Sequence, residues 1–138
     1  MSLPALGVCL ALAAQPAAAP VFVPAERFTL AWTHSIEKVR WEEDYEVALR
    51  GGAPALLAVA ARVRGSGAGM EPPAGAVLRD GWYEFAPARR VHGELALTRS
   101  PYTADYDFCA GGACRPLSAL LPSDGGVTRL AACRGRSG

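Results

Sequence analysis

The sequence lacks an excess of charge of either sign. Lys and Arg together number 14, Asp and Glu number 13, and the net charge is +1. Because no basic excess is present, we expect no binding of nucleic acid. The sequence also lacks an acidic run that would predict a disordered acidic arm. Lysine is scarce, since Lys38 is the only one. We interpret the arginine-rich remainder as a compositional bias.

The chain is also too short for a second core of normal size. Its 138 residues fit one domain, which excludes a TIM barrel and a Rossmann enzyme with a separate substrate domain. No stretch shows a long helical period, and no pattern identifies a cofactor. Hydrophobic residues make up 51% of the chain, which is enough for a globular core.

Alternating segments separated by Gly and Pro dominate what is present. On one face, the run 28–35 carries Phe28, Leu30, Trp32 and His34. The run 41–50 carries Trp41, Glu43, Tyr45, Val47 and Leu49 on one face, and Glu42, Asp44 and Glu46 on a face that we interpret as solvated. Leu57, Val59, Ala61 and Val63 share a face of a third run. Further strands are expected at 81–85, 94–98, 102–109 and 127–131. This pattern predicts an all-β fold, a single small β-sandwich or barrel of short antiparallel strands.

The N-terminal segment 1–19 has no charged side chain and ends in three alanines. An apolar run followed by small residues predicts a secretory signal peptide, with 20–138 as a single β domain in the periplasm or otherwise exported. Cleavage after Ala13 is an alternative, as is a flexible Ala/Pro tail. The short apolar stretch is interrupted by proline, so we do not expect the chain to span a membrane.

Removal of this segment would leave Cys109, Cys114 and Cys133. Cys109 and Cys114 flank Ala-Gly-Gly-Ala, and a short Gly-rich connection in an oxidising compartment predicts a disulfide between them. Cys133 is then left over, either free or in competition for one of the others. This spacing does not predict a zinc site, because no second ligand pair accompanies it.

Two segments supply the candidate ligand-binding residues, which are His34, Ser35, Glu37, Glu42, Arg64, Gly65, Ser66, Gly67 and Gly69. The alternating glycines let a ligand approach backbone N–H groups, and the Arg64 guanidinium adds a fork for a small anion. No Gly-Lys-Ser/Thr follows, so the segment is not a P-loop. His34 is either a core histidine or a ligand-contacting imidazole at the end of its strand.

Two other interpretations stay open. The chain is a small hydrolytic or metal-dependent enzyme that uses His34 and carboxylates, or it is a purely structural module whose glycines shape the fold. The tryptophans and tyrosines either line an aromatic pocket or belong to the core and its rim.

The order of several motifs resembles a family of bacterial proteins. These motifs are Trp32–Lys38 with Trp41–Glu43, Gly65–Pro73, Asp80–Trp82, and Asp105–Cys109 with Cys114–Leu117. Together they resemble the domain of unknown function (DUF) family 1850 over about residues 28–121. Members are often encoded beside, or fused to, tripartite (TRAP-type) solute transporters of the TAXI subclass. The resemblance therefore implies an extracytoplasmic accessory or small-ligand-binding domain, partnered by a TRAP permease or binding protein. It assigns no catalytic residue.

Overall fold

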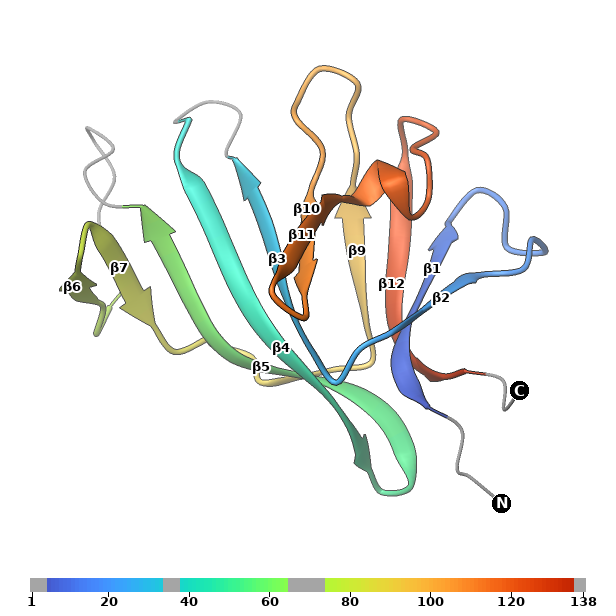
Figure 1. Ribbon diagram of the computed structural model, residues 1–138, viewed down its shortest axis with the longest axis horizontal. Coiled ribbons are helices and arrows are strands. Elements are labelled where there is room, and N and C mark those ends of the chain that lie inside the picture. Colours follow the sequence, from blue (N-terminus) through green and yellow to red (C-terminus); the bar gives the residue numbers. More distant parts are fainter. Residues whose placement is uncertain (1–4, 34–37, 65–73, 136–138) are drawn as a thin grey trace.

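The computed structural model describes residues 5–33, 38–64 and 74–135, which form two antiparallel sheets packed together (Figure 1). Sheet A has the order β2 (Val21–Pro24), β1 (Leu6–Leu12), β12 (Val127–Arg134) and β9 (Glu94–Thr98). Sheet B has the order β11 (Ala113–Pro116), β10 (Asp107–Ala110), β3 (Arg27–Thr33), β4 (Arg40–Arg50), β5 (Ala53–Arg64), β7 (Trp82–Phe85) and β6 (Val77–Arg79), and β8 (Val91–His92) pairs with β5. The all-β prediction is confirmed, and the architecture is the sandwich rather than the barrel.

Helical structure in the described residues is confined to η1, a 3-10 turn at Leu117–Ala119. None of the described residues belongs to a helix with the length and apolar character needed to cross a membrane.

The core lies where the inner faces of the two sheets meet. Its fully buried side chains include Leu30, Leu56 and Phe108 from sheet B and Val8, Leu10 and Leu130 from sheet A. Phe28 stacks on Tyr45 and on Phe108, with ring centroids 5.2 Å and 5.0 Å apart. The predicted alternation of β3 and β4 is confirmed, because Phe28 and Leu30 point into this core.

The alternation predicted for the third run is wrong at its start. Asp44 pairs with Ala60 but Tyr45 pairs with Ala58, so β5 carries one extra residue, Val59, in a bulge. A bulge shifts every side chain beyond it to the opposite face. Val59 is consequently 40% exposed, whereas Ala58 is buried.

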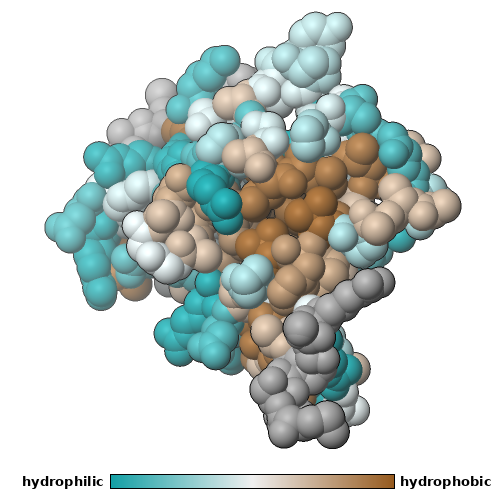
Figure 2. Space-filling view, turned by 45° about the vertical axis from the view of Figure 1, so that its right-hand side comes forward, coloured by the Kyte–Doolittle hydropathy of each residue, from teal (hydrophilic) through white to brown (hydrophobic). Residues whose placement is uncertain are grey.

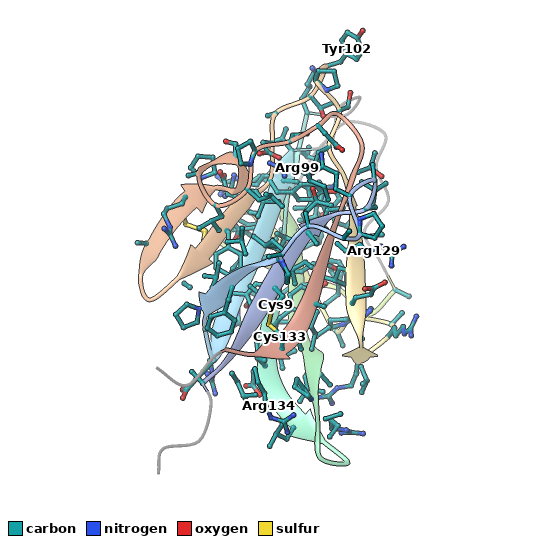
Figure 3. All side chains as sticks on the ribbon, turned by 90° about the vertical axis from the view of Figure 1, so that its right-hand side faces the viewer. Cys9, Arg99, Tyr102, Arg129, Cys133 and Arg134 are labelled. Atoms are coloured by element: carbon teal, nitrogen blue, oxygen red, sulfur yellow. A yellow bond between two sulfur atoms is a disulfide. The ribbon has the colours of Figure 1, made fainter. Side chains whose placement is uncertain are left out.

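The strand predicted at 102–109 is also too long, since β10 begins only at Asp107. The preceding residues form a loop that Arg99 closes. The Arg99 side chain, 1% exposed, donates two hydrogen bonds to the Asp105 carboxylate, at 3.0 Å and 2.7 Å, and a third to Thr128 Oγ1 at 3.1 Å. The tip of this loop carries Tyr102, which is 94% exposed and projects from the molecule (Figure 3).

Strands β1 and β2 lie in the part of the sequence where no strand was predicted. β1 occupies an interior position in sheet A, between β2 and β12, and its Val8 and Leu10 are fully buried. A Cβ at Gly7 would meet the backbone of Val23, so the hairpin is tightly packed there. Cleavage of residues 1–19 is not tested by the fold and stays a prediction, but it would remove a core strand.

A disulfide joins the first strand to the last. Cys9 on β1 is bonded to Cys133 on β12, and these strands pair along their whole length (Figure 3). The expectation that Cys133 is left over is therefore corrected, because it rested on discarding Cys9 with a leader. A second disulfide joins Cys109 and Cys114, which face each other across the β10–β11 hairpin. The start of β1 and the end of β12 accordingly lie side by side, since Leu6 pairs with Arg134 (Figure 1).

Candidate functional site

Strand β4 presents successive carboxylates to opposite sides of sheet B. Its pairing with β3 places Trp41 opposite Trp32, Glu43 opposite Leu30, and Tyr45 opposite Phe28. Since side chains alternate along a strand, Glu43 points to the inner, apolar side and Glu42 and Asp44 point to the outer side. A carboxylate on the core side of a strand is uncommon unless it has a specific role.

A cavity of about 210 Å³ surrounds Glu43 between the sheets. We call it the intersheet pocket, and its lining residues are Leu30, Trp32, Glu43, Tyr45, Leu95, Ala96, Leu97 and Tyr106. β3 and β4 contribute one wall, and β9, the edge strand of sheet A, contributes the opposite wall. Among the described residues that line it, Glu43 is the one that carries a charge.

Aromatic rings form much of the pocket wall and its surroundings. Trp32 stacks on Trp41 with ring centroids 6.3 Å apart and lies 5.9 Å from Tyr106 in a tilted arrangement. Trp41 meets Phe85 edge to face at 6.3 Å. The indole N–H of Trp41 is buried and has no acceptor among the described residues. The rings are large and rigid, so they define a preformed apolar surface.

Glu43 is fixed by Tyr45, whose hydroxyl donates a hydrogen bond of 2.9 Å to the carboxylate. Burial, followed by the negative charge of Glu43 and this hydrogen bond, raises the pKa of Tyr45. Burial also raises the pKa of Tyr106, and the charges of Asp105 and Glu43 add to that rise. Both phenols are therefore neutral hydrogen-bond donors at ordinary pH, and the charge of Glu43 acts across the pocket.

Tyr106 is held in the pocket wall by the loop that Arg99 closes. Asp105, which receives both hydrogen bonds from Arg99, also accepts the backbone N–H of Tyr106 at 2.9 Å. Burial would raise the pKa of Asp105, but the hydrogen bond and charge of Arg99 outweigh it and lower that pKa. This ionised pair fixes the backbone on which Tyr106 is carried.

The outer side of the same strands carries a network of paired charges. Arg62 donates to Glu42 at 2.7 Å and to Asp44 at 2.8 Å, and Arg40 donates to Glu42 at 2.9 Å and to Asp107 at 3.2 Å. Burial would raise the pKa values of Glu42 and Asp44, but hydrogen bonds to these guanidinium groups outweigh it and lower both. The side predicted to be solvated is therefore an ion-pair network whose carboxylates already have partners.

The structure places two of the sequence-predicted ligand-binding residues outside the intersheet pocket. Glu42 belongs to the outer network. Arg64, paired with Trp82 across β5 and β7, lies with its guanidinium 5.4 Å from the indole ring. Their role in binding a ligand is not tested by this placement.

The other predicted residues, namely His34, Ser35, Glu37, Gly65, Ser66, Gly67 and Gly69, lie outside the described residues. β3 ends at Thr33, which pairs with Arg40 at the start of β4, and β5 ends at Arg64. β3 and β5 both border β4 and are antiparallel to it, so these two strands end at the same end of sheet B.

No group of three or more His, Cys, Asp or Glu residues capable of holding a metal ion occurs within 5–33, 38–64 and 74–135.

A larger groove, of about 820 Å³, lies beside the end of β4 and is lined partly by Ala25, Val47 and Leu49. Figure 2 shows an apolar area bordered by hydrophilic residues on the side of the molecule that carries β1 and β2. Three of the four charged residues in its described lining have partners, since Arg27 pairs with Glu46 at 3.1 Å and Arg134 donates to the Gly52 carbonyl at 2.8 Å, whereas the Glu26 side chain has none among the described residues. We consider the intersheet pocket the better candidate for specific recognition, because its carboxylate is held in place beside aromatic rings.

Glu43 was not among the predicted ligand-binding residues, although the alternation of the run 41–50 placed it on the apolar face. The available signal was its position in the alternation, since it shares a strand face with Trp41, Tyr45 and Val47, all apolar or aromatic.

Comparison with known proteins gives one family, described as a domain of unknown function (DUF1850), which matches residues 28–117. Neither a curated protein nor a solved structure matches the chain.

Proposed function

The chain belongs to the DUF1850 family, whose function is unknown, and from the geometry of its intersheet pocket we propose that it is a non-catalytic, extracytoplasmic domain that binds a small ligand. The carrying observation is the concave aromatic pocket with one fixed carboxylate, Glu43. Ligand sites are commonly largely preformed, mostly apolar and furnished with a few placed polar groups.

The compartment is supported by the two disulfides, Cys9–Cys133 and Cys109–Cys114. Disulfides persist in oxidising environments, which indicates a location outside the cytoplasm. The periplasm is our proposal for that location.

Native mass spectrometry of the full chain, purified from its own oxidising compartment, tests the binding function. We expect a bound small molecule in the wild type and in Glu42→Gln, which alters only the outer side of β4, and its loss in Trp32→Ala. If Trp32→Ala fails to fold, Trp32→Phe replaces it, with circular dichroism as the check. A wild-type protein without any bound species, or a ligand kept equally by the pocket variants, contradicts the proposal.

The same spectra bear on the other two interpretations. A stoichiometric metal that is lost in His34→Ala would favour a metal-dependent enzyme. A chain that binds nothing and unfolds with Gly67→Ala would favour a purely structural module.

We also propose, on the family resemblance, that the domain associates with a TRAP-type permease or binding protein. Tyr102 is suited to such a contact, because tyrosine is enriched at interfaces and this one is 94% exposed on a loop closed by a buried arginine. Co-purification at native expression level should recover the partner with the wild type and with Thr103→Ala, but less of it with Tyr102→Ala. Absence of any transporter component from the wild-type sample would refute the association.

A further inference from the structure

The charge balance of β4 differs between its two sides. On the outer side, Glu42 and Asp44 are each hydrogen-bonded to Arg62 at 2.7–2.8 Å. On the inner side, Glu43 has a phenol as its partner and forms no ion pair with any residue within the described ranges. Half-buried carboxylates are usually compensated by a cation, because removing a charge from water is costly. The intersheet pocket thus has a negative charge that the surrounding described residues do not neutralise.

The surroundings of Glu43 suit one kind of cation. Trp32 and Tyr106 both line the pocket with ring centroids 5.9 Å apart, and Trp41 stacks on Trp32. An indole or phenol ring attracts a cation lying within about 6 Å of its face, and quaternary ammonium groups are recognised in this way. The Tyr45 phenol orients this carboxylate, since it donates a hydrogen bond to one of its oxygens.

We propose that the intersheet pocket binds a small organic ammonium ion, with its charged nitrogen opposite Glu43 and its alkyl groups against Trp32 and Tyr106. This inference rests on the proposed binding function and names the ligand class. The cavity of about 210 Å³ is below the roughly 300–1,000 Å³ that holds a drug-sized ligand. It therefore suits a compact ligand or the headgroup of a longer one.

Other ligand charges fit the pocket less well. An inorganic anion would meet Glu43 with like charge. A hard metal ion such as Ca²⁺ requires six to eight oxygen ligands, whereas the wall here is mostly hydrocarbon and aromatic. A quaternary ammonium ion has no N–H group, is weakly hydrated and carries apolar surface, so it loses less hydration on entering the pocket and gains from contact with the rings.

Calorimetric titration of the full chain with choline chloride tests the inference. The neutral comparison is 3,3-dimethyl-1-butanol, which has the same shape with carbon in place of the charged nitrogen. We expect choline to bind at least tenfold more tightly than the alcohol, and Glu43→Gln to remove that difference. Glu46→Gln, which replaces a carboxylate of the same strand that pairs with Arg27 away from the pocket, should leave choline affinity within twofold of wild type. Thermal unfolding of each variant confirms that it is folded.

The outcomes separate the ligand class from the binding function. Equal affinity for choline and the alcohol, or choline binding unchanged in Glu43→Gln, overturns the organic cation while leaving the pocket as a binding site. No binding of choline at millimolar concentration also overturns it. Phosphate or acetate binding that is lost in Arg64→Ala would replace it with the small anion expected from the sequence. If no compound binds and none is found in the natively purified chain, the binding function itself fails.

Discussion

The hydroxyl of Tyr45 donates a hydrogen bond of 2.9 Å to the carboxylate of Glu43, and both side chains lie on the core-facing side of β4. The two residues are separated by one position on the strand, so their side chains point the same way. The pair holds the Glu43 carboxylate in place at the wall of an apolar pocket, where a carboxylate without a hydrogen-bond partner would be strongly disfavoured.

Ionisation of the tyrosines provides a first test of that environment. Burial and the charge of Glu43 raise the pKa of Tyr45 above its ordinary value of 10.0. A raised pKa contributes stability that is fully present below the unfolded value and is lost as pH rises beyond it. We expect phenolate absorbance to develop at higher pH in the folded chain than in the chain dissolved in denaturant. We also expect the unfolding free energy of Tyr45→Phe to fall less with rising pH above 10.0 than that of the wild type. Coincident curves for folded and denatured protein would contradict the burial of this pair.

The ion-pair network on the outer side of β4 predicts that the unfolding free energy decreases at acidic pH. Arg62→Ala leaves Glu42 and Asp44 without their shared partner, and we expect it to cost about 1–3 kcal/mol in unfolding free energy at neutral pH. Both carboxylates have lowered pKa values, so their contribution is present above the ordinary values of 4.5 and 3.8 and is lost as pH falls through the lower folded values. The difference between wild type and variant, measured by denaturant unfolding, should therefore shrink in acid. Arg129→Ala serves as the control, because its pair with Glu94 is more than half exposed on both sides and should contribute less than about 0.5 kcal/mol. A difference that is constant with pH would exclude the network as its source.

The two disulfides should contribute unequally to stability. Cys9 and Cys133 are 124 positions apart, whereas Cys109 and Cys114 are 5 apart. On the chain-entropy model, the longer loop stabilises by about 5 kcal/mol and the shorter one by about 2 kcal/mol. Replacement of each pair by serine, followed by denaturant unfolding of the full chain, should give the larger loss for Cys9 and Cys133. Equal losses would show that native-state effects outweigh loop closure.

The N-terminus of the mature protein distinguishes a leader from a strand. Val8 and Leu10 are fully buried in β1, which pairs with both β2 and β12. We expect deletion of residues 1–19 to abolish cooperative unfolding, because it removes the buried strand β1. Intact-mass analysis of the natively produced protein then shows whether Leu6–Leu12 is retained or removed with the predicted leader. A mature chain that begins at Pro20 and still unfolds cooperatively would support the predicted leader.

Much of sheet B could be predicted from alternation alone. β3, β4 and β7 occur where polar and apolar residues alternate between turn residues, because period two is direct evidence of a strand with one buried side. β1 could not be distinguished this way. An interior strand of small apolar residues and the apolar part of a leader have the same composition, and only pairing partners more than a hundred positions away decide between them.

The site was only partly predictable for a similar reason. The sequence placed Trp32, Trp41 and Tyr45 on apolar faces and raised an aromatic pocket as one interpretation, but it did not identify Glu43 as the charged group within it. The position of Tyr106 in the pocket wall depends on the hydrogen bonds between Arg99 and Asp105, which close the preceding loop. The bulge at Val59 likewise depends on the match between two particular strands, which no local pattern reports.

The location of ligand binding is tested most directly by nuclear magnetic resonance of the indole N–H groups in the nitrogen-15-labelled full chain. Trp32 lines the intersheet pocket and Trp41 stacks on it, whereas Trp82 lies beneath Arg64 across β5 and β7. On addition of choline chloride, or of the ligand recovered from the native protein, we predict that the Trp32 and Trp41 signals shift and that the Trp82 signal does not. A saturable shift of Trp82 with Trp32 and Trp41 unchanged would place binding elsewhere and contradict the account.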